Sequence, residues 1–230
     1  MAMLDWVRFP THWIEAEEHH LRDVTWAEDG IDGLAGLMVL IVIVQHTDQE
    51  TGEAKVTYDL LQKATGLSRS TIARGLGFIE GKLVEKLSQS RYRIAGYDAG
   101  RGWAMLPAKP LYTGKGQISF FQEFRCRKAV ELNALKLYLL FVSRRDRNDN
   151  MAHVTYDMIE DYTGIERDHI KSALSFLAAN GMIHIEHVPS KVSKFGVANA
   201  YRITRLEAYR HMGTTGRQYD ARGFFNGPSE

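Results

Sequence analysis

The sequence predicts an α+β protein, mainly α-helical, built from two similar units in tandem. Three observations predict this class. The segment VTYDLLQKATGLSRSTIARGL at residues 56–76 recurs without a gap as VTYDMIEDYTGIERDHIKSAL at residues 154–174. A long apolar run precedes each copy, and two short strand-like segments follow each copy. Self-similarity over this length indicates an internal duplication that covers most of the chain.

Composition sets the outer limits of the prediction. A chain of 230 residues with 44% hydrophobic residues can bury one large core or two ordinary ones. The only cysteine is Cys126, so we expect a structural thiol, no intrachain disulfide and a reducing, cytoplasmic location. The longest apolar run, residues 37–44, is far shorter than the roughly 20 residues of a membrane span, so no membrane association is expected. The net charge of +1 alone does not indicate a polyanionic partner, although basic residues gather at residues 69–93.

Each unit is expected to open with a buried helix, formed by the apolar runs at residues 37–44 and 135–142. A short second helix follows, where Thr57 and Thr155 occupy the N-cap position and can accept a hydrogen bond from a free backbone N–H. It ends at Gly66 or Gly164, because glycine readily takes the positive φ of a left-handed turn.

A third helix begins after Ser68 or Glu166. Ile72, Leu76 and Ile79 follow one another at the i, i+4 and i+7 spacing of a helix, so we expect one face of this helix to be buried. Two strands around a polar loop complete each unit, at LVEKLSQ and RYRIAGY and at MIHIEHV and NAYRITR. Helix, helix, turn, helix and β-hairpin make a winged helix, in which the third helix enters a DNA major groove.

The predicted organisation is an N-terminal winged-helix domain at 1–100 with an acidic extension, a C-terminal winged-helix domain at 101–210, and a flexible tail at 211–230. The split falls near residues 99–102. A shift of 97 positions also aligns DWVRFP with GWAMLP and pairs Trp6 with Trp103, so a short element opening each half is a further candidate repeat.

The segment TGLSRSTIARGLGFIEGKLVE resembles the helix-turn-helix of phage and plasmid replication proteins and of many bacterial regulators. The two-copy layout resembles the tandem winged-helix plasmid replication initiators. The resemblance implies binding to repeated origin sites, with one winged domain reading DNA and the other partly serving dimerisation.

Candidate DNA contacts lie on the face of the third helix opposite Ile72 and on the strands that follow. Arginine can bond bidentately to guanine, and hydroxyl groups can contact bases or phosphates. Arg69 and Arg74 lead this hypothesis, against the alternative that they are ordinary residues of a solvated face. The candidates in the first unit are Thr57, Ser68, Arg69, Ser70, Thr71, Arg74, Arg91 and Arg93.

The second unit is expected to bind DNA less strongly, because Glu166 and Asp168 at the start of its third helix would repel a phosphate. Its candidate contacts are Arg167, His169, Lys171 and Ser172 on the helix. Lys191 and Lys194 are candidates in the longer hairpin loop, which can also be a plain solvated tip.

The function predicted is sequence-specific binding of double-stranded DNA without catalysis, cofactor or metal. No HExxH, GxxxxGK[ST] or GxGxxG motif is present. Replication initiation at a plasmid or phage origin and transcriptional regulation both fit, with a homodimer and the replication or transcription machinery as partners. An architectural module that grips a protein is the alternative from another class. Trp6, Trp13, Trp26 and Phe9 form either a stacking surface for single-stranded nucleic acid or a small satellite core.

Overall fold

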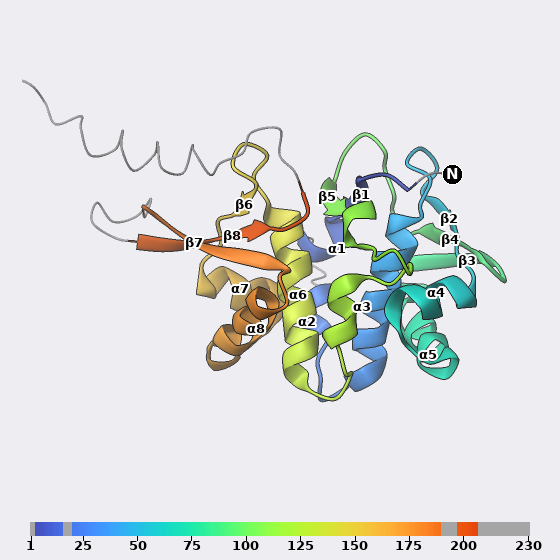
Figure 1. The fold of residues 1–230 in the computed structure, drawn as a ribbon, viewed down its shortest axis with the longest axis horizontal. Helices are drawn as coiled ribbons and strands as arrows, with labels where there is room; N and C mark the ends of the chain where they lie inside the picture. The colour runs from blue at the N-terminus through green and yellow to red at the C-terminus, as the bar shows by residue number, and fades with distance from the viewer. Residues whose placement is uncertain (1–2, 16–19, 190–196, 207–230) are drawn as a thin grey trace, which may run out of the picture.

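The computed structural model describes residues 3–15, 20–189 and 197–206. It shows a helix-rich α+β protein, with helices α1 to α8 and three small antiparallel sheets in this part of the chain (Figure 1). The predicted fold class is therefore confirmed at this level. Within the same residues, no helix has both the length and the apolar character needed to cross a membrane.

The two halves share one order of elements. The first comprises α3 (Gly30–Gln45), β2 (Glu53–Lys55), α4 (Tyr58–Thr65), α5 (Arg69–Ile79), β3 (Val84–Ser88) and β4 (Arg91–Ile94). The second comprises α6 (Ala129–Arg144), β6 (Met151–Ala152), α7 (Tyr156–Thr163), α8 (Arg167–Ala179), β7 (Ile183–Pro189) and β8 (Val197–Ile203). The strand orders, β2-β4-β3 and β6-β8-β7, also correspond.

The predicted helix caps are present in both halves. The side chains of Thr57 and Thr155 accept hydrogen bonds from the backbone nitrogens of Leu60 and Met158, each at 3.2 Å. Gly66 ends α4 at φ 75° and Gly164 ends α7 at φ 63°, both in the left-handed region. The repeated sequence thus gives the same local geometry twice.

Two apolar helices, α3 and α6, form the centre of the molecule. Residues 33–45 of α3 are all buried, as expected for a helix that is apolar on every side. In Figure 1, α4 and α5 lie on one flank of the α3–α6 pair, and α7 and α8 lie on the other. Buried apolar side chains from both halves form one continuous cluster, so the chain has one large core instead of two separate ones.

A two-stranded ribbon joins the halves. β1 (Trp6–Pro10) pairs antiparallel with β5 (Trp103–Pro107), and Arg8 lies opposite Met105 at the centre of the ladder. The segments DWVRFP and GWAMLP, expected to open each half, are these two strands. Exchanging each residue with its counterpart 97 positions away leaves the ladder unchanged, so the ribbon has an approximate two-fold axis.

The opening segment of each half also packs on the other half. After β1 come α1 (His12–Glu15) and α2 (His20–Asp23), and Arg22 of α2 forms an ion pair with Asp161 of α7 at 3.3 Å. After β5 come the 3-10 helices η1 (Lys109–Leu111) and η2 (Ser119–Glu123), between which the Ile118 nitrogen donates to the Ala64 carbonyl of α4 at 2.9 Å. The boundary near residues 99–102 stays a prediction, and many contacts cross it. The predicted tail at 211–230 lies outside the described residues.

Candidate nucleic-acid interface

Helix α5 is held by its N-cap and by the core. The Ser68 hydroxyl accepts a hydrogen bond from the Thr71 nitrogen at 3.2 Å, and it also lies 2.9 Å from the Ser70 hydroxyl. Ile72, Leu76 and Ile79 are buried. The helix therefore presents its opposite face to solvent in a fixed orientation.

The exposed face of α5 is small, polar and basic. Ser70, Ala73, Arg74 and Gly77 are exposed, as the predicted helical wheel requires. No carboxylate occurs within α5 itself. Gly75 is buried against α3, whereas a Cβ on Gly77 would meet nothing within 4 Å. Because Ala73 has a small side chain and Gly77 has none, a partner can approach the helix closely at these positions.

Arg69 does not stand free at the start of α5. Its guanidinium lies 3.0 Å from a carboxylate oxygen of Asp59 on α4, and 5.7 Å from the centre of the Tyr58 ring. Both charged side chains are more than half exposed. Such a surface pair contributes at most about 1 kcal/mol, so a phosphate can compete for the guanidinium.

The second half contains the same arrangement. Arg167 at the start of α8 forms an ion pair with Asp157 of α7 and lies 5.7 Å from the centre of the Tyr156 ring. The pair occurs at equivalent positions in the two halves, and in each it joins the two helices on either side of the turn. Its repetition is the signal in the sequence that would have revealed it.

Arg74 and the strand arginines also have carboxylate neighbours. Arg74 lies 3.3 Å from Asp32, in the first turn of α3. On the outer face of the sheet, Arg91 and Arg93 lie 3.2 and 2.5 Å from the two carboxylate oxygens of Glu53. Sequence analysis missed Asp32, Asp59 and Glu53, because these acids are distant from the arginines along the chain.

Helix α8 is less suited to a polyanion. Its N-cap residue, Glu166, makes no capping hydrogen bond through its side chain, and it lies 3.9 Å from His169. Asp168 is exposed in the first turn. Lys171 and Ser172 are exposed, and the Ser172 hydroxyl donates to the His169 carbonyl at 2.8 Å. Two carboxylates thus accompany the cationic candidates of this helix.

Two further groups of candidates were the hairpin-loop lysines and the N-terminal aromatic residues. Lys191 and Lys194 lie outside the described residues. Phe9 and Trp13 are buried, with ring centres 5.8 Å apart, and so belong to the core. Trp6 is 38% exposed and stacks on Trp103. In the described part of the chain, no group of three His, Cys, Asp or Glu residues could hold a metal ion.

Cys126 has the character of a structural thiol. It is buried, and burial together with the nearby Glu131 carboxylate raises the pKa of the thiol to about 11. A thiol with this pKa is protonated at neutral pH and is a poor nucleophile.

Comparison with known proteins adds no assignment. The chain matches no protein-family model, no curated protein and no solved structure at a level that would indicate a relationship.

Proposed function

We propose that the chain is a tandem winged-helix protein, derived by internal duplication, that binds double-stranded DNA with α5 as its main reading helix. The observation that carries the proposal is the exposed face of α5, where Ser70, Arg74 and two small residues project from a helix that contains no carboxylate. The shared order of helix, helix, turn, helix and hairpin supports the winged-helix assignment.

Replication initiation at a plasmid or phage origin is the specific function we favour, and transcriptional regulation is the second. Both use the same contacts and need no catalysis or cofactor. Two linked units can engage successive grooves, because linkage converts the second binding event into an intramolecular one. A homodimer on repeated sites, recruiting the replication or transcription machinery, is compatible with this function.

The test is selection of bound fragments from a random and a genomic duplex library at about 150 mM salt, where non-specific phosphate binding is already weak. We expect a defined motif, with tandem copies at an origin supporting replication and a promoter site supporting regulation. Arg74→Ala should weaken binding by roughly tenfold, as expected for loss of one good base contact. Lys171→Ala on α8 is the matched control and should have a smaller effect. Absence of any enriched motif would contradict the proposal.

A protein-interaction module is the candidate from another class, favoured by the pairing of Arg69, Arg74 and Arg93 with carboxylates. Carboxylates beside the arginines repel a polyanion, whereas a protein partner can complement both signs of charge. Salt dependence separates the two candidates. If the protein contacts phosphates, the logarithm of its affinity should fall with the logarithm of the salt concentration, with a slope of about −0.9 for each phosphate contact. A protein partner should give a much shallower slope.

A further inference from the structure

The β1–β5 ribbon has an aromatic surface that the proposed duplex contacts do not use. The indole rings of Trp6 and Trp103 are stacked, with centres 6.0 Å apart and planes inclined by 16°. Trp6 is opposite Pro107 and Trp103 is opposite Pro10 in the ladder. The two indoles therefore extend toward each other along the ribbon and meet over its central residue pair.

The ribbon does not bury this aromatic pair. Along β1 the side chains alternate, with Val7 and Phe9 buried and with Trp6 and Arg8 on the outer face. The core beneath is complete without Trp6, since Val7 is 1% exposed and Phe9 is fully buried. The Trp6 side chain is large and apolar, and it is 38% exposed near the approximate two-fold axis of the ribbon. It is therefore available to a ligand.

Arginines surround the aromatic pair. The guanidinium carbons of Arg8 and Arg147 each lie 5.4 Å from the centre of the Trp103 ring. Arg145 donates to the sulfur of Met105, the residue opposite Arg8, at 3.0 Å. Burial and then the proximity of Arg147 lower the pKa of Arg145, while Asp146 and Asp149 oppose this effect.

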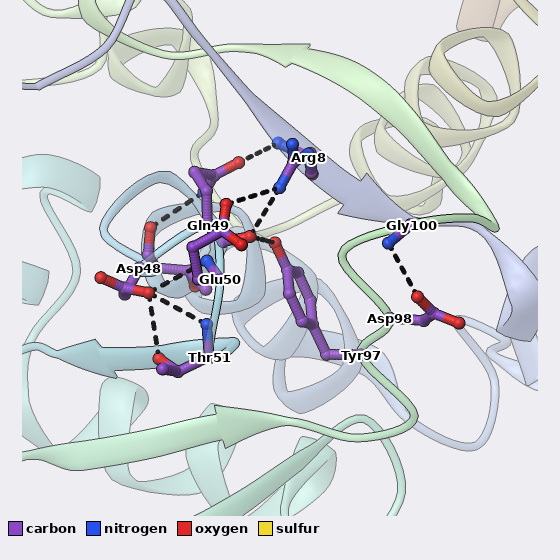
Figure 2. Close-up of polar contacts among 9 residues, drawn as sticks. Arg8, Asp48, Gln49, Glu50, Thr51, Tyr97, Asp98 and Gly100 are labelled. Carbon is purple, nitrogen blue, oxygen red and sulfur yellow. Dashed lines mark hydrogen bonds and ion pairs between the residues drawn. The ribbon is translucent and has the colours of Figure 1, made fainter.

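Arg8 lies on β1, and its side chain is held in place by contacts with the loop that follows α3. As Figure 2 shows, its side chain donates to the Gln49 carbonyl at 2.7 Å and forms an ion pair with Glu50 at 3.4 Å. Tyr97 donates to the same carbonyl at 2.8 Å (Figure 2). The guanidinium is thus fixed near Trp103 before any ligand arrives.

Nearby carboxylates are already engaged. Asp146 accepts a hydrogen bond from the Asn148 nitrogen at 2.6 Å, and Asp149 lies 2.5 Å from His153. A third nearby carboxylate, Glu50, forms an ion pair with Arg8, and Asp146 and Asp149 act electrostatically on Arg145. Arg147 has no carboxylate within ion-pair distance among the described residues, and it is exposed. The charge of Arg8 is thus paired with Glu50, whereas the exposed guanidinium of Arg147 lies beside the indoles without a described ion-pair partner.

We propose that Trp6, Trp103, Arg8 and Arg147 form a binding site for single-stranded DNA. An unpaired base can stack on an exposed indole, and the guanidiniums can contact the flanking phosphates. The choice of DNA rests on the proposed function, whereas the stacking site itself does not. In Figure 1 the ribbon lies at the upper edge of the molecule, whereas α5 and α8 lie toward the lower edge, so a single strand and a duplex would occupy different surfaces.

The test compares two labelled oligonucleotides of about 12 nucleotides, one of thymidine and one abasic, by fluorescence anisotropy with the full chain at about 100 mM salt. They carry the same phosphates and differ only in bases. We expect the thymidine strand to bind roughly tenfold more tightly, as base stacking on an aromatic side chain predicts. Trp6→Ala should remove this preference, whereas Trp6→Phe, which keeps an aromatic ring, should retain part of it. Arg147→Ala should weaken both strands equally.

Ile31→Ala is the matched control, since Ile31 is 36% exposed on α3 and should not affect either strand. Equal binding of the two oligonucleotides by the wild-type protein would overturn the inference, as would an unchanged preference in Trp6→Ala. Tighter binding of a uridine RNA strand would overturn the assignment to DNA. The two proposals can fail separately. If duplex selection yields no motif but the protein still prefers the thymidine strand in a Trp6-dependent way, the proposed duplex function is contradicted and the stacking site is supported.

Discussion

Gly75 of α5 crosses α3 at Gly36 with no room for a side chain. A Cβ at Gly75 would lie 2.8 Å from the Gly36 nitrogen, and a Cβ at Gly36 would lie 3.1 Å from the Gly75 carbonyl oxygen. These atoms belong to the backbone of packed helices and cannot move aside cheaply. The orientation of the proposed reading helix therefore depends on two glycines.

Gly75→Ala should lower the free energy of unfolding by about 1–3 kcal/mol, because the new methyl group overpacks the helix crossing. Gly77→Ala provides the matched comparison, since the space beside Gly77 is open. That change should raise the free energy of unfolding by up to about 1 kcal/mol through helix propensity. Urea unfolding followed by circular dichroism measures both, and equal effects of the two substitutions would contradict the close crossing.

The two third helices should respond oppositely at their N-caps. Ser68→Ala removes the capping hydrogen bond of α5 and should cost about 1 kcal/mol of stability. Glu166→Ser supplies a cap that α8 lacks and should stabilise by about 0.5 kcal/mol, after loss of the favourable charge at the helix N-terminus. Thermal unfolding of the two variants tests this, and destabilisation by Glu166→Ser would count against it.

Lys136 should make stability depend on pH. It is buried in α6, where its ammonium group donates to the backbone carbonyls of Arg22 and Val24. Burial lowers the pKa of Lys136 to about 8, despite the opposing effect of Asp29 and Asp23. Since the unfolded pKa is higher, the unfolded chain binds more protons above pH 8, and stability should rise with pH through this window.

Lys136→Met isolates this effect, because Met38 occupies the equivalent position in α3. Between about pH 7.5 and 9.5 the wild-type free energy of unfolding should rise by about 2 kcal/mol relative to that of the variant. Lys109→Met, at an exposed position, should behave as the wild type does. Parallel pH profiles for wild type and Lys136→Met would show that Lys136 does not titrate in this range.

Asp59→Asn should strengthen DNA binding, because it frees Arg69 and removes a negative charge from the edge of the proposed interface. The slope of logarithmic affinity against logarithmic salt concentration should steepen by about 0.9 if Arg69 gains a phosphate contact. The stability cost should stay below about 1 kcal/mol, as for other exposed pairs. Asp157→Asn is the equivalent change in the second half. An unchanged affinity in Asp59→Asn would place Arg69 outside the interface.

Local signals in the sequence predicted the repeated elements well. Thr57, Gly66 and the spacing of Ile72, Leu76 and Ile79 each act within one or two helical turns, so the residues themselves specify the caps and the buried face. Between α5 and β3, Gly81 adopts a left-handed conformation at φ 78°.

Contacts between distant segments were not predictable in the same way. The alignment matched Trp6 with Trp103 as repeated residues, but nothing in a repeat indicates that its two copies pair with each other. The burial of Lys136 depends on where α2 packs, and the partners of Arg74 and Arg93 lie on other elements. Such relationships follow from tertiary packing, which periodicity does not encode.

The pairing of β1 with β5 also has a consequence for how the protein folds. β1 is synthesised before β5, which follows only after residues 11–102 have been added to the chain. Contacts that close so long a stretch of chain form slowly, because the entropy of the intervening residues opposes them. During translation, therefore, the nascent first half carries an unpaired strand edge and an α3 surface that α6 has not yet covered.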